Sequence, residues 1–232
     1  MEKYLFEEEL ISGLIKSRPN RFIMLVEING TTEKCHCPAT GKIGNIEFKN
    51  IPCLLSKSDN PARKTKYTVE AISRVPKTWI GINQTKANNY IEFFLRANQL
   101  KKIILVKDLK REVKLNLSRI DFLVNDNTFL EVKTPLRFLP FGNKKEKEEK
   151  FNSFERLNRH FNDISKEIKN NKRAIVILCY LFNAERFKAP KTGNTKEVSK
   201  INSSLSKGIE LWQVNLKVDK KGVSLIDYYK LN

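Results

Sequence analysis

The sequence predicts an α+β protein of two domains, a small β-barrel followed by a larger α/β layer. From about residue 9 to 80, apolar residues occur in short runs separated by turn signals, which is typical of a barrel or sandwich of short strands. After Trp79, helical spacing and continuous apolar runs replace this pattern, as expected of an α/β layer. We therefore divide the chain into residues 1–80 and residues 81–232.

The length and composition of the chain fit this organisation. Its 232 residues, 40% of them hydrophobic, can form a folded protein with a sizeable core. No apolar run approaches the ~18 residues that a membrane-spanning helix needs, and the first ten residues lack the basic start and apolar core of a signal peptide. Four scattered cysteines are too few for a disulfide scaffold. We expect a cytoplasmic protein with free thiols and no membrane partner.

The barrel is predicted from five runs with turn formers between them. The turn signals are the Asn-Gly pair at 29–30, the sequence PATG at 38–41 and the sequence DNP at 59–61. A five-stranded Greek-key barrel fits in this length. The five runs are ELISGLIK, RFIMLVEI, EKCHCP, NIEFKNIPCLLS and TKYTVEAISRV.

The second half of the chain alternates helical and strand patterns. Apolar residues at 90, 91, 94 and 95 predict a helix over 86–98, and those from 151 to 168 predict an amphipathic helix of about five turns. The apolar run 174–182 predicts a strand covered on both faces. The remaining predicted elements are a strand at 111–117, a short helix at 198–205 and strands at 209–218 and 223–229.

Two carboxylates occupy unusual positions in the segment RIDFLVNDNTFLEVK, residues 119–133. Its three central residues are turn formers, and if they form the loop, residues equidistant from Asp126 face each other. Asp121 then faces Glu131 on one side of the hairpin. The other side carries Ile120, Phe122, Val124, Leu130 and Val132.

Facing carboxylates predict a cation site. They repel each other by roughly 0.2–1 kcal/mol or more, and a divalent cation such as Mg²⁺ turns this repulsion into binding because it takes carboxylate oxygens. Lys133, which the same register places opposite Arg119, would stabilise charge on a phosphate or orient a water. The alternative is a charged face exposed to solvent. A two-residue turn would instead place Asp121 opposite Val132.

The charge balance indicates a polyanionic partner. Lys and Arg number 44 against 26 Asp and Glu, a net charge of +18, and each phosphate that a cation neutralises releases counterions. The alternative explanation of the charge is that the protein comes from an organism whose protein surfaces are generally rich in Lys. A membrane-surface protein would show a concentrated basic amphipathic helix, and none is evident. We therefore expect nucleic acid as the partner.

Basic and aromatic residues are interspersed in the barrel domain, as in proteins that bind single strands. Phe22, Phe48, Tyr67 and Trp79 are candidate stacking platforms, but a barrel this small needs most of its aromatic side chains in its core, so we expect one or two at most to be exposed. The candidate phosphate contacts are Arg18, Arg21, Lys34, Lys42, Lys57, Arg63, Lys64 and Lys66.

The triplet Cys35-His36-Cys37 suggests a zinc site only weakly. It lacks the CxxC spacing and a second pair of ligands, and alternation along a strand would turn His36 away from both cysteines. We expect no zinc here.

The pattern of an Asp followed by Glu-X-Lys on a hairpin resembles the motif of the PD-(D/E)XK nucleases, and the chain as a whole resembles the sugar fermentation stimulation protein A (SfsA) family. The resemblance covers nearly the whole chain in order. Its motifs are RPNRFIMLVEINGTTEKCHCPATGK at 18–42, NPARKTKYTVEAI at 60–72, WIGINQTKANNYIEFFL at 79–95, SRIDFLV with FLEVKTP at 118–135, FERLNRHFNDI at 154–164 and the closing GIELWQVNLKV.

This resemblance implies an N-terminal OB-fold domain, a C-terminal α/β domain like that of the PD-(D/E)XK nucleases, and DNA binding. Asp121, Glu131 and Lys133 fall on the catalytic motif, with the two acids as metal ligands. Glu92 falls where the superfamily often has a further metal-side carboxylate, although exposure is its ordinary explanation.

The resemblance also implies a role for the segment around residue 156. Glu155, Arg156 and His160 match a Glu-Arg…His segment of the family, but Leu157 stands where we expect a glycine, which leaves the role of Glu155 open. Arg156 and His160, one turn apart on a helix, are candidate phosphate contacts. His160 is equally an ordinary histidine on the flank of that helix.

We therefore expect a DNA-binding protein with a phosphodiesterase site dependent on Mg²⁺ or Mn²⁺. The competing hypothesis is a non-enzymatic DNA-binding or regulatory protein that retains a nuclease-like fold, and a third is a protein directed to RNA. The presence of two acids and a lysine together favours the catalytic hypothesis, because a surface that only binds gains nothing from paired acids that face phosphate.

Overall fold

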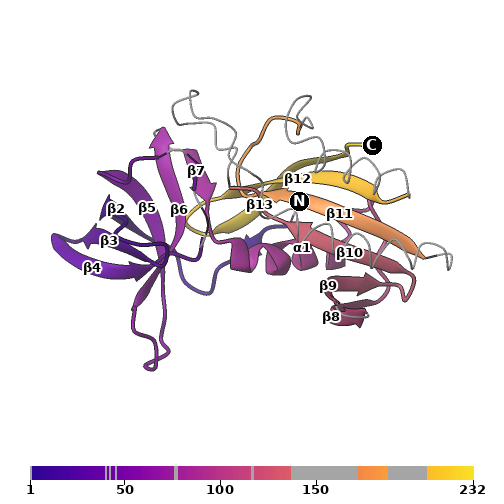
Figure 1. Ribbon diagram of the computed structural model, residues 1–232, viewed down its shortest axis with the longest axis horizontal. Coiled ribbons are helices and arrows are strands. Elements are labelled where there is room, and N and C mark those ends of the chain that lie inside the picture. Colours follow the sequence, from indigo (N-terminus) through magenta and orange to yellow (C-terminus); the bar gives the residue numbers. More distant parts are fainter. Residues whose placement is uncertain are drawn as a thin grey trace.

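The computed structural model describes residues 2–39, 41, 43–44, 46–75, 78–115, 118–136, 172–187 and 208–232. These residues form two β-sheets that lie side by side, with a helix packed on the larger one (Figure 1). The smaller sheet is formed by the N-terminal part of the chain and the larger by the C-terminal part. The one exception is strand β1, Tyr4–Leu5, which pairs in the larger sheet.

The smaller sheet closes into a five-stranded barrel. Its strands follow the order β4-β3-β2-β5-β6-β7, and β4 also pairs in parallel with β6, which joins the two sides of the sheet. This is the strand arrangement of the OB fold. The predicted five-stranded barrel is confirmed. Its strands, followed by β7, are β2 Ile11–Ser17, β3 Ile23–Ile28, β4 Thr31–His36, β5 Ile51–Lys57, β6 Tyr67–Val75 and β7 Thr78–Gly81.

Local sequence explains the barrel strands. In β3 the residues Met24, Val26 and Ile28 are buried while those between them are half-buried, the period of two that one covered face requires. The turn to β4 uses Asn29 and Gly30, both with positive φ (50° and 82°). Such a turn matches the twist of the two strands and requires residues that tolerate the left-handed region.

The larger sheet has seven strands in the order β1-β13-β12-β11-β10-β9-β8. The pairs β10–β11 and β11–β12 are parallel, and the other neighbours are antiparallel. Apart from β1, its strands are β8 Leu109–Leu115, β9 Ser118–Val124, β10 Thr128–Lys133, β11 Arg173–Tyr180, β12 Glu210–Val218 and β13 Gly222–Lys230.

Helix α1, Ala87–Arg96, covers one face of this sheet and follows the short 3₁₀ helix η1, Gln84–Lys86. The predicted apolar stripe is confirmed, because Tyr90, Ile91, Phe94 and Leu95 are all buried. They share one apolar core with residues of β9 to β13. The apolar side chains of the sheet therefore hold the helix in place.

The expected α/β layer is not confirmed. In the part of the chain that the structure describes, the second unit is mainly sheet with α1 as its single α-helix. The helices predicted at 151–168 and 198–205 lie outside the described residues. The apolar run at 174–182 does form a buried strand, β11. The division at residues 80 and 81 stays a prediction.

The two sheets meet at a close backbone contact. Gly81, the last residue of β7, donates its N–H to the carbonyl of Leu181 at 2.8 Å. A Cβ at Gly81 would lie 2.5 Å from the Cβ of Leu181, so this approach requires glycine. Gln84 Nε2 also donates to the carbonyl of Thr134 at 2.5 Å. The end of the barrel and the 3₁₀ helix after it are thus hydrogen-bonded to the segments that follow β11 and β10.

A buried carboxylate ties the barrel to the start of α1. Glu70 on β6 is 2% exposed. It accepts hydrogen bonds from Ser56 Oγ at 2.6 Å, Asn83 Nδ2 at 2.7 Å and Lys86 Nζ at 3.0 Å. Lys86 immediately precedes α1. A buried charge with three donors is stable only while all of them stay in place.

Replacing Glu70 by Ala should lower the free energy of unfolding by about 2–4 kcal/mol, because Asn83 and Lys86 lose their buried acceptor. Urea denaturation measures this difference. The control is Glu47→Ala, which removes an exposed carboxylate and should change stability by no more than about 0.5 kcal/mol. Equal stability of the two variants would contradict a structural role for Glu70.

Candidate functional site

The hairpin β9–β10 has the register that the sequence predicted. Val124 pairs with Thr128, Leu123 with Phe129 and Phe122 with Leu130. Asn125 and Asp126 both adopt positive φ, at 51° and 56°, which Asn and Asp tolerate. Asp121 and Glu131 are therefore opposite each other, one position beyond the last of these pairs.

Beyond that last pair, the two carboxylates take the place of the backbone ladder. Asp121 Oδ2 accepts the N–H of Val132 at 2.7 Å, and Glu131 Oε2 accepts the N–H of Asp121 at 3.4 Å. Each acid thus accepts a hydrogen bond from the backbone of the facing strand. The strands separate at this point, and the acid pair occupies the fork between them.

Two further side chains from the described residues contact this acid pair. Lys133 Nζ donates to Glu131 Oε1 at 2.5 Å, and Asn88 Nδ2 on α1 donates to Asp121 Oδ1 at 2.8 Å. The structure therefore brings together the predicted residues Asp121, Glu131 and Lys133 and adds Asn88.

Burial gives the acid pair unusual electrostatics. Glu131 is 2% exposed, so the alternative of a solvent-exposed charged face does not hold for this residue. Burial, and then the charge of Glu131, raise the pKa of Asp121 to about 6. The Val132 N–H, Lys133 and Asn88 act in the opposite direction but do not offset the burial. Asp121 therefore exchanges a proton within reach of neutral pH.

Glu92 is not joined to this pair. One turn after Asn88 on α1, its carboxylate accepts hydrogen bonds from Arg96 Nε and Arg111 Nη1, both at 2.9 Å. Among the described residues, no group of three or more His, Cys, Asp or Glu side chains could hold a metal ion. Within the described ranges, Asp121 and Glu131 are the two carboxylates that converge, and Glu92 as a third metal ligand stays a prediction.

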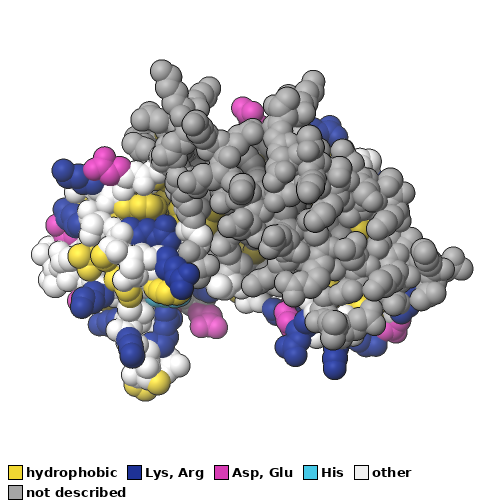
Figure 2. All heavy atoms as spheres, viewed as in Figure 1, with side chains coloured by type: hydrophobic (Ala, Val, Ile, Leu, Met, Phe, Trp, Pro, Cys, Tyr) yellow, Lys and Arg dark blue, Asp and Glu magenta, His cyan; other side chains and the backbone are white. Residues whose placement is uncertain are grey.

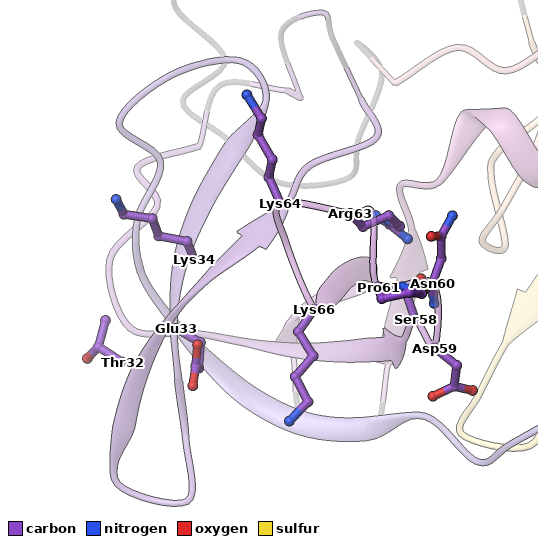
Figure 3. Close-up of a pocket in the computed structure, with 10 residues that line it drawn as sticks. All are labelled: Thr32, Glu33, Lys34, Ser58, Asp59, Asn60, Pro61, Arg63, Lys64 and Lys66. Atoms are coloured by element: carbon purple, nitrogen blue, oxygen red, sulfur yellow. Dashed lines mark hydrogen bonds between the residues drawn. The ribbon is translucent and has the colours of Figure 1, made fainter.

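A second candidate site is a basic groove on the barrel. It has a volume of about 540 Å³ and lies between β4 and the loop that joins β5 to β6. Figure 3 shows Lys34 from β4 and Arg63, Lys64 and Lys66 from the loop spread around it. The acids in the lining are Glu33 and Asp59. Four cations against two acids leave the groove net positive.

The other predicted basic residues differ in their surroundings. Arg18 Nη2 donates to the carbonyls of Ala39 at 2.7 Å, Gly41 at 3.1 Å and Arg21 at 3.2 Å, so its guanidinium holds a loop together. Arg21 lies over the ring of Phe22, with 4.6 Å from its Cζ to the ring centroid. Lys57 forms an exposed ion pair. Lys42, Arg156 and His160 lie outside the described residues.

The aromatic residues of the barrel are mostly used for packing. Phe48, Tyr67 and Trp79 are half-buried against the apolar cores, and Phe22 is 44% exposed. The expectation that one or two at most of the four would be exposed is confirmed. Phe22 and Arg21 lie in the loop between β2 and β3, one of the loops with which OB folds bind their ligands.

The cysteines of the Cys35-His36-Cys37 triplet face the barrel core. Both are fully buried, and His36 between them is half-buried, as alternation along β4 predicts. Burial raises the pKa of the Cys35 thiol to about 12. Burial and the nearby Arg63 lower the pKa of His36. All four cysteines of the chain have free thiols.

Sequence reasoning missed Asn88. The signal was its position on the polar side of the predicted helix, four residues before Glu92 and so on the same face. The expectation of a metal site singled out the carboxylate Glu92 on that face. An amide that donates to a carboxylate serves the site equally well.

The protein thus has two parts. One is a closed OB barrel, a fold that binds ligands, and the other is a mixed sheet with a buried acid pair that is a candidate cation site. The family model of the SfsA N-terminal OB domain matches residues 17–82. The part of the chain that the structure describes contains no helix long and apolar enough to cross a membrane.

The comparisons extend this likeness to the whole chain. The sugar fermentation stimulation protein homolog of Clostridium beijerinckii is 35% identical over 128 residues, 53% of this chain and 55% of the relative. That of Pelagibacter ubique is 27% identical over 95% of both chains. The solved structure of Pyrococcus furiosus SfsA in complex with Ca²⁺ superimposes with a TM-score of 0.77 over 98% of both chains, at 19% identity. The chain is similar to SfsA-family proteins, and its matches to the first of these relatives span about half of their length.

The raised pKa of Asp121 makes stability depend on pH. An unfolded Asp loses its proton near pH 4, whereas the folded chain keeps this proton to about pH 6. Stability from this group is therefore complete below pH 4 and is lost as pH rises to 6, by about 3 kcal/mol. Without divalent cations, Asp121→Asn should be more stable than wild type at pH 7.5, and the difference should disappear near pH 4.

Urea denaturation in EDTA at several pH values measures this difference. The control is Asp59→Asn, which changes an exposed acid and should follow the wild type at every pH. If the advantage of Asp121→Asn were the same at pH 4 and pH 7.5, the acid pair would not be the cause.

Proposed function

We propose that this protein binds DNA through its barrel and hydrolyses phosphodiester bonds at the acid pair, with Mg²⁺ or Mn²⁺ as cofactor. Under this proposal the C-terminal domain, from residue 81, is of the PD-(D/E)XK nuclease kind. The observation that carries it is the convergence of Asp121 and Glu131 in a fork, with Lys133 hydrogen-bonded to Glu131.

The donors at the fork fit a hard divalent cation. Two carboxylates converge there, and the charge of Glu131 contributes to the raised pKa of Asp121. Oxygen donors that repel each other are suitable ligands for Mg²⁺ or Mn²⁺. The Pyrococcus furiosus SfsA of the same fold was solved with Ca²⁺. A bound cation would act there as a Lewis acid that offsets the negative charge developing on the phosphate.

The side chains around the acids have distinct roles in this proposal. Lys133, 29% exposed, carries an ammonium that can reach a phosphate oxygen at the mouth of the fork. Asn88 fixes the orientation of Asp121, since its amide donates to Oδ1 while Oδ2 accepts the Val132 N–H. The acids are thus held in place before a cation or a substrate arrives.

The barrel groove supports the binding half of the proposal. Its cations come from β4 and from the loop that OB folds commonly use for oligonucleotides. Arg21 and the exposed Phe22 on the neighbouring β2–β3 loop add a charge and a ring on which a base can stack. The chain's charge of +18 favours association with a polyanion over long distances.

One observation favours the non-enzymatic alternative. Glu92, the expected third carboxylate, is held by Arg96 and Arg111. Two carboxylates bind a hard cation more weakly than three. A DNA-binding or regulatory protein that uses the cation to hold the hairpin, without cleavage, is therefore the second candidate.

The binding proposal predicts a steep dependence on salt. The affinity for duplex DNA should fall with a log–log slope of about −0.9 per phosphate neutralised, measured by fluorescence anisotropy. Charge reversal at Arg63 and Lys64 should weaken binding to every DNA sequence tested. A slope near zero would rule out a polyanionic partner. Unchanged affinity in the variant would move the contacts to the C-terminal domain, and tighter binding to RNA would favour that polymer instead.

The cleavage proposal predicts that metal binding and DNA binding separate. Replacing Asp121 or Glu131 by Ala should abolish Mn²⁺ binding in a calorimetric titration and abolish cleavage, because one of two ligands is lost. DNA affinity should stay the same or rise, because a charge that repels phosphate is removed. Lys133→Ala should keep metal binding and lose activity.

The matched control for these variants is Glu47→Ala, which removes an exposed acid from the segment between β4 and β5 and should change neither metal binding nor cleavage. Equal Mn²⁺ affinity of wild type and Asp121→Ala would remove the proposed site. Mn²⁺ binding without cleavage of duplex, single-stranded, flap or RNA substrates would favour the non-enzymatic alternative.

A further inference from the structure

Two cations lie beside the acid pair on the same face of the sheet. Lys114 of β8 pairs with Arg119 of β9 in the antiparallel register. Arg119 precedes Asp121 by two residues, so the two side chains point to the same face, with their Cα atoms about 7 Å apart. Figure 2 shows Lys and Arg side chains along the lower edge of the molecule, where Figure 1 places β8 and β9.

The charges of these two residues are not neutralised by close partners. Lys114 is exposed and has no hydrogen bond or ion pair with any residue in the described ranges. Arg119 is 69% exposed on its side chain, and its ion pair with Glu112 is long, at 4.0 Å. An exposed pair of this length contributes little and exchanges readily for another anion.

The neighbouring cations of β8 differ in this respect. Lys110 Nζ donates to Asp126 Oδ1 at 2.6 Å. Arg111 donates to Glu92 at 2.9 Å and to Asn89 at 3.0 Å. Both are therefore occupied by acids or amides of the protein. Four basic residues lie on β8 and at the start of β9. The two next to the fork, Lys114 and Arg119, are the two that no close acid or amide of the described residues holds, so they can bind another anion.

We propose that Lys114 and Arg119 bind the phosphates that flank the one held at the acid pair. This inference rests on the proposed function and adds a second nucleic-acid contact, on the C-terminal part of the chain, to the groove of the barrel. The ligand is a phosphodiester backbone of either polymer, without base specificity, because exposed ammonium and guanidinium groups recognise phosphate.

The spacing and charge of the site fit this ligand. Each strand of B-DNA carries one phosphate per ~3.4 Å of axis, so a cation about 7 Å from the acid pair reaches a phosphate one or two nucleotides away. Asp121 and Glu131 repel the approaching backbone. Lys114 on β8, Arg119 on β9 and Lys133 on β10 would surround the two carboxylates with positive charge.

The test compares two double variants that each lose two positive charges. Lys114→Ala with Arg119→Ala removes the proposed site. Lys217→Ala with Lys220→Ala removes two exposed lysines on β12 and the turn after it, three strands away from β9. Anisotropy with labelled duplex DNA at a fixed Ca²⁺ concentration and several concentrations of monovalent salt gives the slope of binding for each protein.

The double variant Lys114→Ala with Arg119→Ala should have a shallower salt slope than wild type, by about 1–2. Lys114→Ala with Arg119→Lys, which keeps one of the two charges, should recover part of the lost slope. The control variant should keep the wild-type slope. For a cleaving enzyme, KM should rise about tenfold or more while kcat and Mn²⁺ affinity stay unchanged. Equal slopes in the two double variants would overturn the inference and leave the proposed function intact. A wild type that binds no nucleic acid would refute the proposed function itself.

Discussion

The exchange of hydrogen bonds between two carboxylates and the facing backbone determines the geometry of the candidate site. Asp121 accepts from the Val132 N–H, and Glu131 accepts from the Asp121 N–H. The strands can therefore separate after three paired residues without leaving these backbone donors unsatisfied, which would otherwise be unfavourable in a buried position. The same bonds fix the carboxylates close together, so the fold itself maintains their repulsion. The candidate cation site is thus a consequence of how the hairpin ends, because a bound cation would relieve the repulsion between the two carboxylates.

This fork is anchored to the rest of the protein through α1. The apolar side of the helix packs on the sheet, and Asn88 on its polar side donates to Asp121. The start of the helix is held by Glu70 of the barrel through Lys86. The close contact of Gly81 with Leu181 fixes the same junction from the other side. A short, rigid connection therefore relates the barrel groove to the acid pair, as a nucleic-acid strand that touches both would require.

Much of this fold could be predicted because local patterns determine it. The alternation in β3, the Asn-Gly turn and the three turn formers at 125–127 fix strands and register without reference to distant residues. Asn88 and Glu70 could not be predicted in the same way, since their partners are 33 and up to 16 residues away in sequence. The engagement of Arg18 with three carbonyls likewise depends on a loop that its own neighbours do not specify. Sequence identifies which charges exist, and packing decides which of them stay available.

That distinction also resolves the apparent conflict between a chain of charge +18 and a site made of acids. Exposed cations act over a Debye length of about 8–10 Å and draw a polyanion toward the surface. The acids lie in a fork where Glu131 is 2% exposed and paired with Lys133, so their repulsion is felt only at contact. For the polyanionic partner proposed above, attraction would govern the approach and repulsion the last few ångströms. A cation at the fork would remove that last repulsion and would couple the arrival of the phosphate to the presence of the metal.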